Sequence, residues 1–155
     1  MIADDAAFVF RLGRSAFGGI SVVTSATNKI LRGSGPVPGV IEVSPRVQST
    51  KVLQYYYPKQ GGIEFVFDPK TNTFAVGKPH PSTGFTGSPH QKLAQSIGAE
   101  EATLVGGTFR RGENGEILTD ELSGHYGEKW TDSIRKQFVQ FMEEATGLVV
   151  NHIPW

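Results

Sequence analysis

The sequence predicts an α+β fold in which a small antiparallel sheet, made of two hairpins and a C-terminal strand, is packed by two helices. Three observations support this fold class. Two pairs of aromatic and β-branched runs are each joined by a turn signal, two stretches carry helix-capping residues and helical spacing, and a last apolar run follows the second helix. The predicted element order is β-β-α-β-β-α-β.

The strands are predicted from composition and turns. Residues 62–67 and 73–77 flank a turn that contains Pro and Asn, which is typical of a hairpin. A second hairpin is predicted at residues 103–111 and 116–122, because an Asn-Gly dipeptide lies between them. The apolar run at residues 148–153 is expected to return to the sheet as a final strand.

Each predicted helix has a readable start. Ser88 suits an N-cap, Pro89 the first helical position and Gln91 the third position of a capping box. The second helix starts after Thr131, which suits an N-cap, and stops at Gly147. Between these ends, apolar residues recur at one-face spacing, so this is expected to be the longest helix.

The chain divides near residue 50. Residues 33–39 are Gly- and Pro-rich and show no helical or strand period, which predicts a loop or linker. We therefore interpret residues 1–50 as an N-terminal extension and residues 51–155 as the main domain. The extension is either a separate delivery or docking segment or a part that packs onto the main domain.

Composition excludes several classes of site. The 155-residue chain has no cysteine, so disulfides, thiolate metal sites and a cysteine nucleophile are excluded. No apolar run approaches the ~20 residues of a membrane span, so we expect no membrane segment in the folded domain. We also expect the protein to be a monomer. The formal net charge is zero, so a polyanion partner needs a local cationic cluster.

The first candidate site is the start of the first helix. His90 would occupy its second position, where the positive end of the helix dipole helps to keep an imidazole neutral and able to act as a base. Ser88 and Lys92 lie within one turn of it, and free backbone N–H groups there can bind a phosphate. The alternative is a helix-start histidine without a role.

The second candidate is the loop of residues 123–127, which precedes the second helix. His125 offers acid/base chemistry, Tyr126 a phenol and Ser123 a hydroxyl, with Lys129 close by. In the alternative interpretation, His125 and Tyr126 only fill the space at the helix start. Arg110, at a strand end, is a further candidate for phosphate binding, although a solvated hairpin tip explains it as well.

No metal or cofactor site is predicted. The sequence contains no H-E-x-x-H or acidic loop, and no P-loop, G-x-S-x-G or Rossmann fingerprint. His80 and His152 are assigned no role. We therefore expect neither a metal nor a cofactor.

The chain resembles the type 43 domain of bacterial polymorphic toxins over about its last hundred residues. The resemblance rests on residues 62–77, on Ser88-Pro89-His90-Gln91-Lys92-Leu93-Ala94, and above all on Ser123-Gly124-His125-Tyr126-Gly127 with Trp130 and the helix to Gly147. The resemblance implies a fold of the barnase, EndoU, colicin and RelE group of metal-independent ribonucleases. It also implies delivery from a secreted or cell-surface protein into the cytoplasm of a neighbouring cell, as in contact-dependent inhibition, and neutralisation by a cognate immunity protein.

On this resemblance the expected substrate is RNA, most of all tRNA. His90 and His125 would share the acid and base roles, Arg110 or Lys92 would hold the phosphate, and Tyr126 would position a base or ribose. Ser88, Ser123 and Lys129 would contribute to substrate binding.

Two other functions stay open. An NAD-consuming toxin, either a glycohydrolase or an ADP-ribosyltransferase, would need fewer cations and could use His125, Tyr126 and a glutamate such as Glu121. A non-enzymatic module could bind a partner through the tyrosines at residues 55–57 and the C-terminal residues 153–155.

Overall fold

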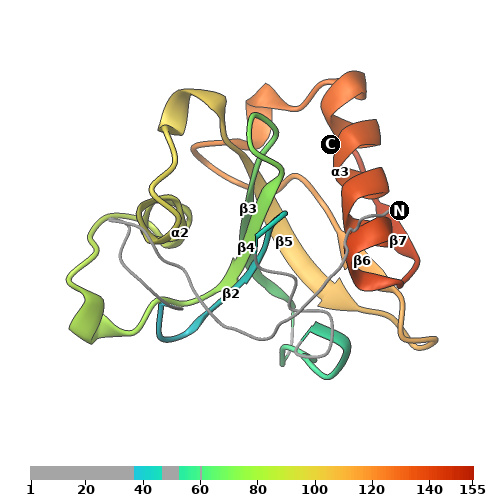
Figure 1. Ribbon diagram of the computed structural model, residues 1–155, viewed down its shortest axis with the longest axis horizontal. Coiled ribbons are helices and arrows are strands. Elements are labelled where there is room, and N and C mark those ends of the chain that lie inside the picture. The colour runs from blue at the N-terminus through green and yellow to red at the C-terminus, as the bar shows by residue number, and fades with distance from the viewer. Residues whose placement is uncertain (1–36, 47–52, 60) are drawn as a thin grey trace.

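The computed structural model describes residues 37–46, 53–59 and 61–155, which form a six-stranded sheet in the order β2-β4-β3-β5-β6-β7 (Figure 1). The strands are β2 (Val40–Val43), β3 (Ile63–Asp68), β4 (Thr73–Gly77), β5 (Val105–Arg111), β6 (Ile117–Thr119) and β7 (Val150–His152). The helices are α2 (Pro89–Ser96) and α3 (Asp132–Thr146), with short 3-10 helices η1 (Pro81–Thr83), η2 (Glu101–Thr103) and η3 (Gly127–Lys129). Neither α2 nor α3 has the length and apolar character needed to cross a membrane.

The α+β fold class and both hairpins are confirmed. β3 pairs with β4 and β5 pairs with β6, each in antiparallel register. The two turns depend on residues that tolerate a left-handed backbone, because Asn72 has φ 54° and Gly115 has φ 80°. β6 is shorter than predicted, since the chain leaves the sheet after Thr119.

Both helices begin as predicted. The Ser88 hydroxyl accepts a hydrogen bond from the Gln91 amide while the Gln91 side chain accepts one from the Ser88 amide, which completes the capping box. Thr131 caps α3 through the Ile134 amide, and Gly147 ends it with φ 72°.

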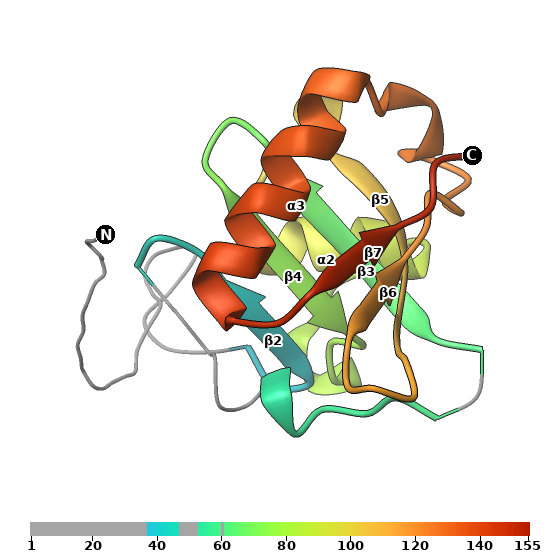
Figure 2. The same ribbon diagram turned by 90° about the vertical axis from the view of Figure 1, so that its right-hand side faces the viewer.

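Two features of the sheet differ from the prediction. The last pair, β6 and β7, is parallel, so the sheet is mixed rather than antiparallel. The reason is that α3 connects β6 to β7 as a crossover, which returns the chain in the same direction (Figure 2). In addition, β2 pairs with β4 at the edge, so residues 40–43 of the predicted extension supply a strand. The apolar runs before residue 36 lie outside the described residues.

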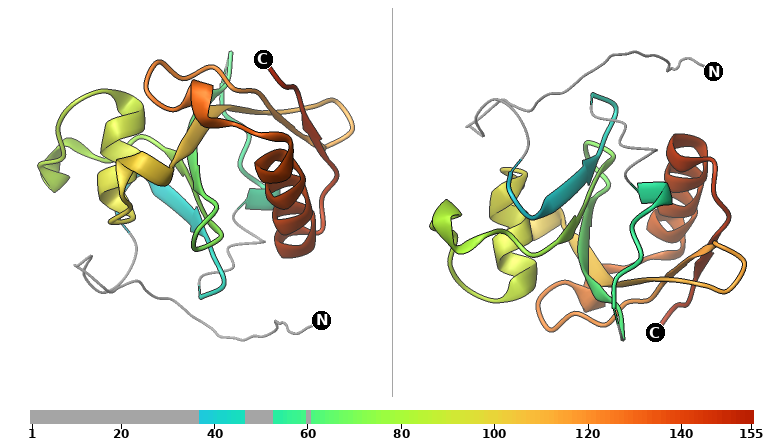
Figure 3. Two further views of the ribbon diagram at one scale, coloured as in Figure 1. Left: turned by 90° about the horizontal axis from the view of Figure 1, so that it is seen from above. Right: turned by 90° about the horizontal axis from the view of Figure 1, so that it is seen from below.

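The two faces of the sheet carry separate cores, with α2 on one face and α3 on the other (Figure 3). On the α3 face, Phe138 stacks against Phe65 with ring centroids 5.4 Å apart. On the α2 face the core is smaller and centres on Val66, Leu93 and Tyr126. The buried residues of the larger core are Val43, Leu53, Phe65, Phe67, Phe74, Val76, Val105, Phe109, Ile117, Trp130, Phe138, Met142 and Val150.

Candidate functional site

His90 lies at the second position of α2 and is 8% exposed. Its Nε2 is 2.9 Å from the carbonyl oxygen of Gly107, which can only accept, so Nε2 carries a proton and donates it. In the neutral ring the lone pair is then on Nδ1. The Gly107 contact therefore fixes the tautomer that can act as a base through Nδ1.

His125 is exposed and lies at the same end of α2. Its Nδ1 is 3.5 Å from the Ser88 hydroxyl at the N-cap. The Tyr126 ring contacts both histidines, with centroid distances of 6.3 Å to His90 and 5.9 Å to His125. The fold thus brings together two histidines that are 35 residues apart in the sequence.

Tyr126 itself is 1% exposed. Its hydroxyl donates to Glu101 Oε1 at 2.9 Å, and burial, followed by this contact, raises the pKa of the phenol. Lys129 lies over the Tyr126 ring and donates to the Glu101 carbonyl at 2.9 Å. Both side chains are therefore positioned to support the histidines, and the substrate contacts expected of Tyr126 and Lys129 stay predictions.

The smaller polar residues frame the same end of α2. Ser123 Oγ accepts a hydrogen bond from the Tyr126 amide at 3.1 Å, which closes the loop that carries His125. Lys92 is half-buried and follows Ser88 by four residues, so both lie on one face of the helix start. No carboxylate pairs with Lys92 within the described parts of the chain, which leaves its charge available to an anion.

The two neighbouring arginines have different environments. Arg110 is exposed and packs against Gly62, where an added Cβ would lie 2.6 Å from Arg110 Cγ. No contact places Arg110 beside either histidine in the described ranges. Arg111 instead donates to the carbonyls of Leu53, Gln54 and Tyr56 and lies 4.3 Å from the centroid of the Tyr57 ring.

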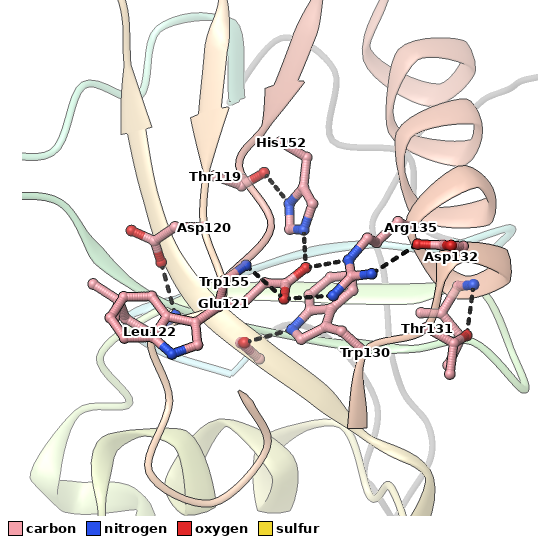
Figure 4. A network of polar contacts seen from close by, with 12 residues as sticks. Thr119, Asp120, Glu121, Leu122, Trp130, Thr131, Asp132, Arg135, His152 and Trp155 are labelled. Atoms are coloured by element: carbon pink, nitrogen blue, oxygen red, sulfur yellow. Dashed lines mark hydrogen bonds and ion pairs between the residues drawn. The ribbon is translucent and has the colours of Figure 1, made fainter. Parts of the chain in front are cut away.

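A second polar network, which the sequence did not indicate, centres on Glu121 (Figure 4). Glu121 is 3% exposed and accepts two hydrogen bonds from Arg135, at 2.7 and 2.9 Å. His152 Nε2 is 2.8 Å from the same carboxylate, and the Trp155 amide donates to it at 3.1 Å. Thr119 Oγ1 is 2.8 Å from His152 Nδ1, so both ring nitrogens are engaged.

The titration behaviour of this network follows from its geometry. Burial alone would raise the pKa of Glu121, but hydrogen bonds from Arg135, His152 and the Trp155 amide outweigh burial and lower it. Burial lowers the pKa of His152, and its contact with Glu121 offsets only part of that effect. The network thus joins an ionised glutamate to a neutral histidine near pH 7.

The free energy of unfolding should therefore decrease as the pH falls below about 6.5, the usual histidine pKa. The unfolded chain binds a proton at His152 before the folded chain does, so acid favours unfolding, and Glu121 adds to the loss below about pH 4. Urea unfolding at pH 7.5 and 5.5 measures this change. His152→Gln should flatten the pH dependence between these values and His80→Gln should not; equal slopes in both variants would contradict the assignment.

No group of three His, Asp or Glu side chains with the arrangement of a metal site occurs within the described residues. A cavity of about 370 Å³ lies between β2 and the C-terminal end of α2, lined by residues that include Glu42, Arg46 and Asp68. None of the predicted site residues lines it. The histidine pair is instead at the opposite, N-terminal end of α2.

Comparison with known proteins gives a family. Residues 14–137 match the family described as bacterial toxin 43, and this range includes both histidines but ends before His152. No curated protein and no solved structure matches the chain significantly. Since the matched range covers most of the chain, the protein belongs to the bacterial toxin 43 family.

Proposed function

We propose that this toxin domain is a metal-independent ribonuclease in which His90 and His125 share the acid and base roles. The observation that carries the proposal is that both imidazoles contact the Tyr126 ring at the start of α2. A buried histidine with a fixed tautomer and an exposed histidine at a helix N-terminus give one phosphodiester a proton acceptor and a proton donor.

The reaction that fits these groups is attack by the ribose 2′-hydroxyl. One histidine removes the 2′ proton, the 2′ oxygen bonds to the adjacent phosphorus, and the bond from phosphorus to the 5′ oxygen breaks as the other histidine protonates that oxygen. The products are a 2′,3′-cyclic phosphate and a 5′-hydroxyl. Lys92 and the His90 backbone N–H would stabilise the negative charge on the phosphorus oxygens.

The biological setting is part of the proposal. The domain would be delivered from a secreted or surface protein of the producer, act on RNA such as tRNA in the cytoplasm of a neighbouring cell, and be neutralised by an immunity protein. Family membership supports this setting. The zero net charge favours a structured or specific RNA over indiscriminate binding, since non-specific affinity comes mostly from phosphate neutralisation.

The NAD-consuming alternative loses support from the position of Glu121. Both of its carboxylate oxygens accept hydrogen bonds, from Arg135, His152 and Trp155. A glutamate that is buried and fully paired in this way cannot approach a dinucleotide without breaking the network.

The test is to incubate the purified protein with total tRNA, with rRNA and with NAD, each in the presence of EDTA. The expected result is RNA fragments that end in 2′,3′-cyclic phosphate, with NAD unchanged. The His80→Gln variant is a matched control. His80 is exposed and caps the η1 turn, so this variant should cleave RNA as the wild type does. Intact RNA together with released nicotinamide would refute the ribonuclease proposal.

A further inference from the structure

Glu64, on β3, has an oxygen with no hydrogen-bond partner. Its Oε1 is the one buried side-chain nitrogen or oxygen atom in the described part of the chain that makes no hydrogen bond. A buried acceptor without a donor costs about 1–3 kcal/mol, so such atoms in folded proteins call for an explanation. A carboxylate accepts hydrogen bonds only. Because Glu64 as a whole is only half-buried, a rotation of its carboxyl group would bring this oxygen to a ligand with N–H or O–H groups.

The sheet register places Glu64 near His90. Glu64 pairs with Thr108, and two residues away Val66 pairs with Gly106, so all four residues face α2. An added Cβ on Gly106 would lie 3.1 Å from the His90 ring. Glu64 is a diagonal neighbour of Gly106, and such residues are roughly 7–8 Å apart. The Glu64 carboxylate thus lies on the same face as the His90 ring, about one diagonal pair away from it.

The neighbouring polar side chains do not supply a hydrogen-bond donor to Glu64 Oε1 within the described structure. The Thr108 hydroxyl donates to Asp120, which also accepts from the Thr108 and Leu122 amides. Tyr56 packs against Phe109 in the core of the α3 face. Burial, and next the charge of Glu64, raise the pKa of Tyr56, yet the two side chains form no hydrogen bond within the described structure.

Arg110 extends the same face in the direction away from His90. It lies two residues beyond Thr108 on β5, on the same side of the sheet, and is exposed. At about 3.3 Å per residue, Gly106 and Arg110 are about 13 Å apart along the strand. An imidazole, an unpaired carboxylate and a free guanidinium therefore follow one another along one strip of the sheet.

We propose that Glu64 accepts a hydrogen bond from the amino group of the nucleobase next to the cleaved phosphate, and that Arg110 binds the following phosphate. This inference rests on the proposed ribonuclease function. The amino groups of cytosine, adenine and guanine are suitable donors for a carboxylate. Uracil offers one N–H between two carbonyl oxygens that repel a carboxylate. The site therefore selects amino-bearing bases against uracil.

The test compares Glu64→Gln with the wild type on poly(C), poly(A) and poly(U). The wild type should cleave poly(C) or poly(A) at least tenfold faster than poly(U), because one good base contact discriminates by about 1–3 kcal/mol. Glu64→Gln should reduce this ratio about tenfold, since an amide can also donate to uracil. Its melting temperature should be unchanged or higher, because the replaced oxygen has no partner. Glu113→Gln, the same change in the exposed β5–β6 turn, should keep the wild-type ratio.

A binding measurement separates this inference from the ribonuclease proposal. Oligo(dC) and oligo(dU) lack the 2′-hydroxyl, so their affinities report base recognition alone, and Glu64→Gln should reduce the preference for oligo(dC). A shifted preference without RNA cleavage would refute the ribonuclease proposal and keep the base contact. Equal losses on all polymers, which a general base would give, would overturn the inference. A wild type that cleaves poly(C), poly(A) and poly(U) at equal rates would also overturn the inference. The same holds if Glu64→Gln leaves the ratio of oligo(dC) to oligo(dU) affinity unchanged.

Discussion

Replacing Glu121 with Ala should lower the free energy of unfolding by about 3 kcal/mol, because one member of a buried, paired network is removed. Three partners lose their acceptor at once: the Arg135 guanidinium, the His152 Nε2–H and the Trp155 amide. These partners belong to α3, β7 and the C-terminal residues, so the loss affects the whole crossover. Urea unfolding at pH 7.5 measures the effect.

Asp132→Ala is the matched control, because Asp132 binds the same guanidinium from outside. Its carboxylate accepts from Arg135 Nη1 at 2.9 Å, but the side chain is 97% exposed. An exposed ion pair contributes about 1 kcal/mol or less. If Glu121→Ala were no more destabilising than Asp132→Ala, the network would not be what attaches α3 and β7 to β6.

Local signals account for the parts of the fold that the sequence predicted. The capping residues Ser88 and Thr131, the Asn-Gly turn and the stop at Gly147 each act within one turn of chain, and each is found where expected. The partner of a strand is not a local property. The parallel alignment of β7 depends on how α3 crosses the sheet, and the pairing of β2 with β4 depends on contacts between distant segments.

The same distinction holds for the sites. His90 and His125 were predicted because each lies at a helix start with a recognisable cap or glycine. Residues 121, 135 and 152 share no motif, and their association appears only when β6, α3 and β7 are assembled. For Glu64, strand alternation gives the face, but not the absence of a donor there.

The two sites are physically connected through the chain that follows β6. An added Cβ on Gly107, whose carbonyl binds His90, would lie 1.8 Å from the Asp120 carbonyl oxygen, and one on Gly127 would lie 2.6 Å from the Glu121 carbonyl oxygen. The backbone around Glu121 therefore packs against β5, whose Gly107 carbonyl accepts the hydrogen bond from His90. It also packs against the end of the loop that carries His125. By fixing this backbone, the Glu121 network would hold the two histidines in place.

Replacing His90 with Gln should reduce kcat for RNA cleavage by about 10²–10⁴-fold, the range for losing a general acid or base. Gln keeps an N–H that can donate to the Gly107 carbonyl, so the fold should be preserved while the titratable nitrogen is lost. His125→Gln should have a loss in the same range and little effect on melting temperature, because His125 is exposed. Single-turnover rates and thermal unfolding of each variant measure both effects.

The double variant decides whether the two histidines act on one phosphodiester. Groups that work together in a single step are strongly non-additive, so the double variant should lose far less than the product of the two single losses. Multiplying losses would mean that the histidines act independently. A His125→Gln variant with full activity would leave His90 as the sole candidate in the pair and assign the second proton transfer to another group, of which Lys92 is the nearest along the helix.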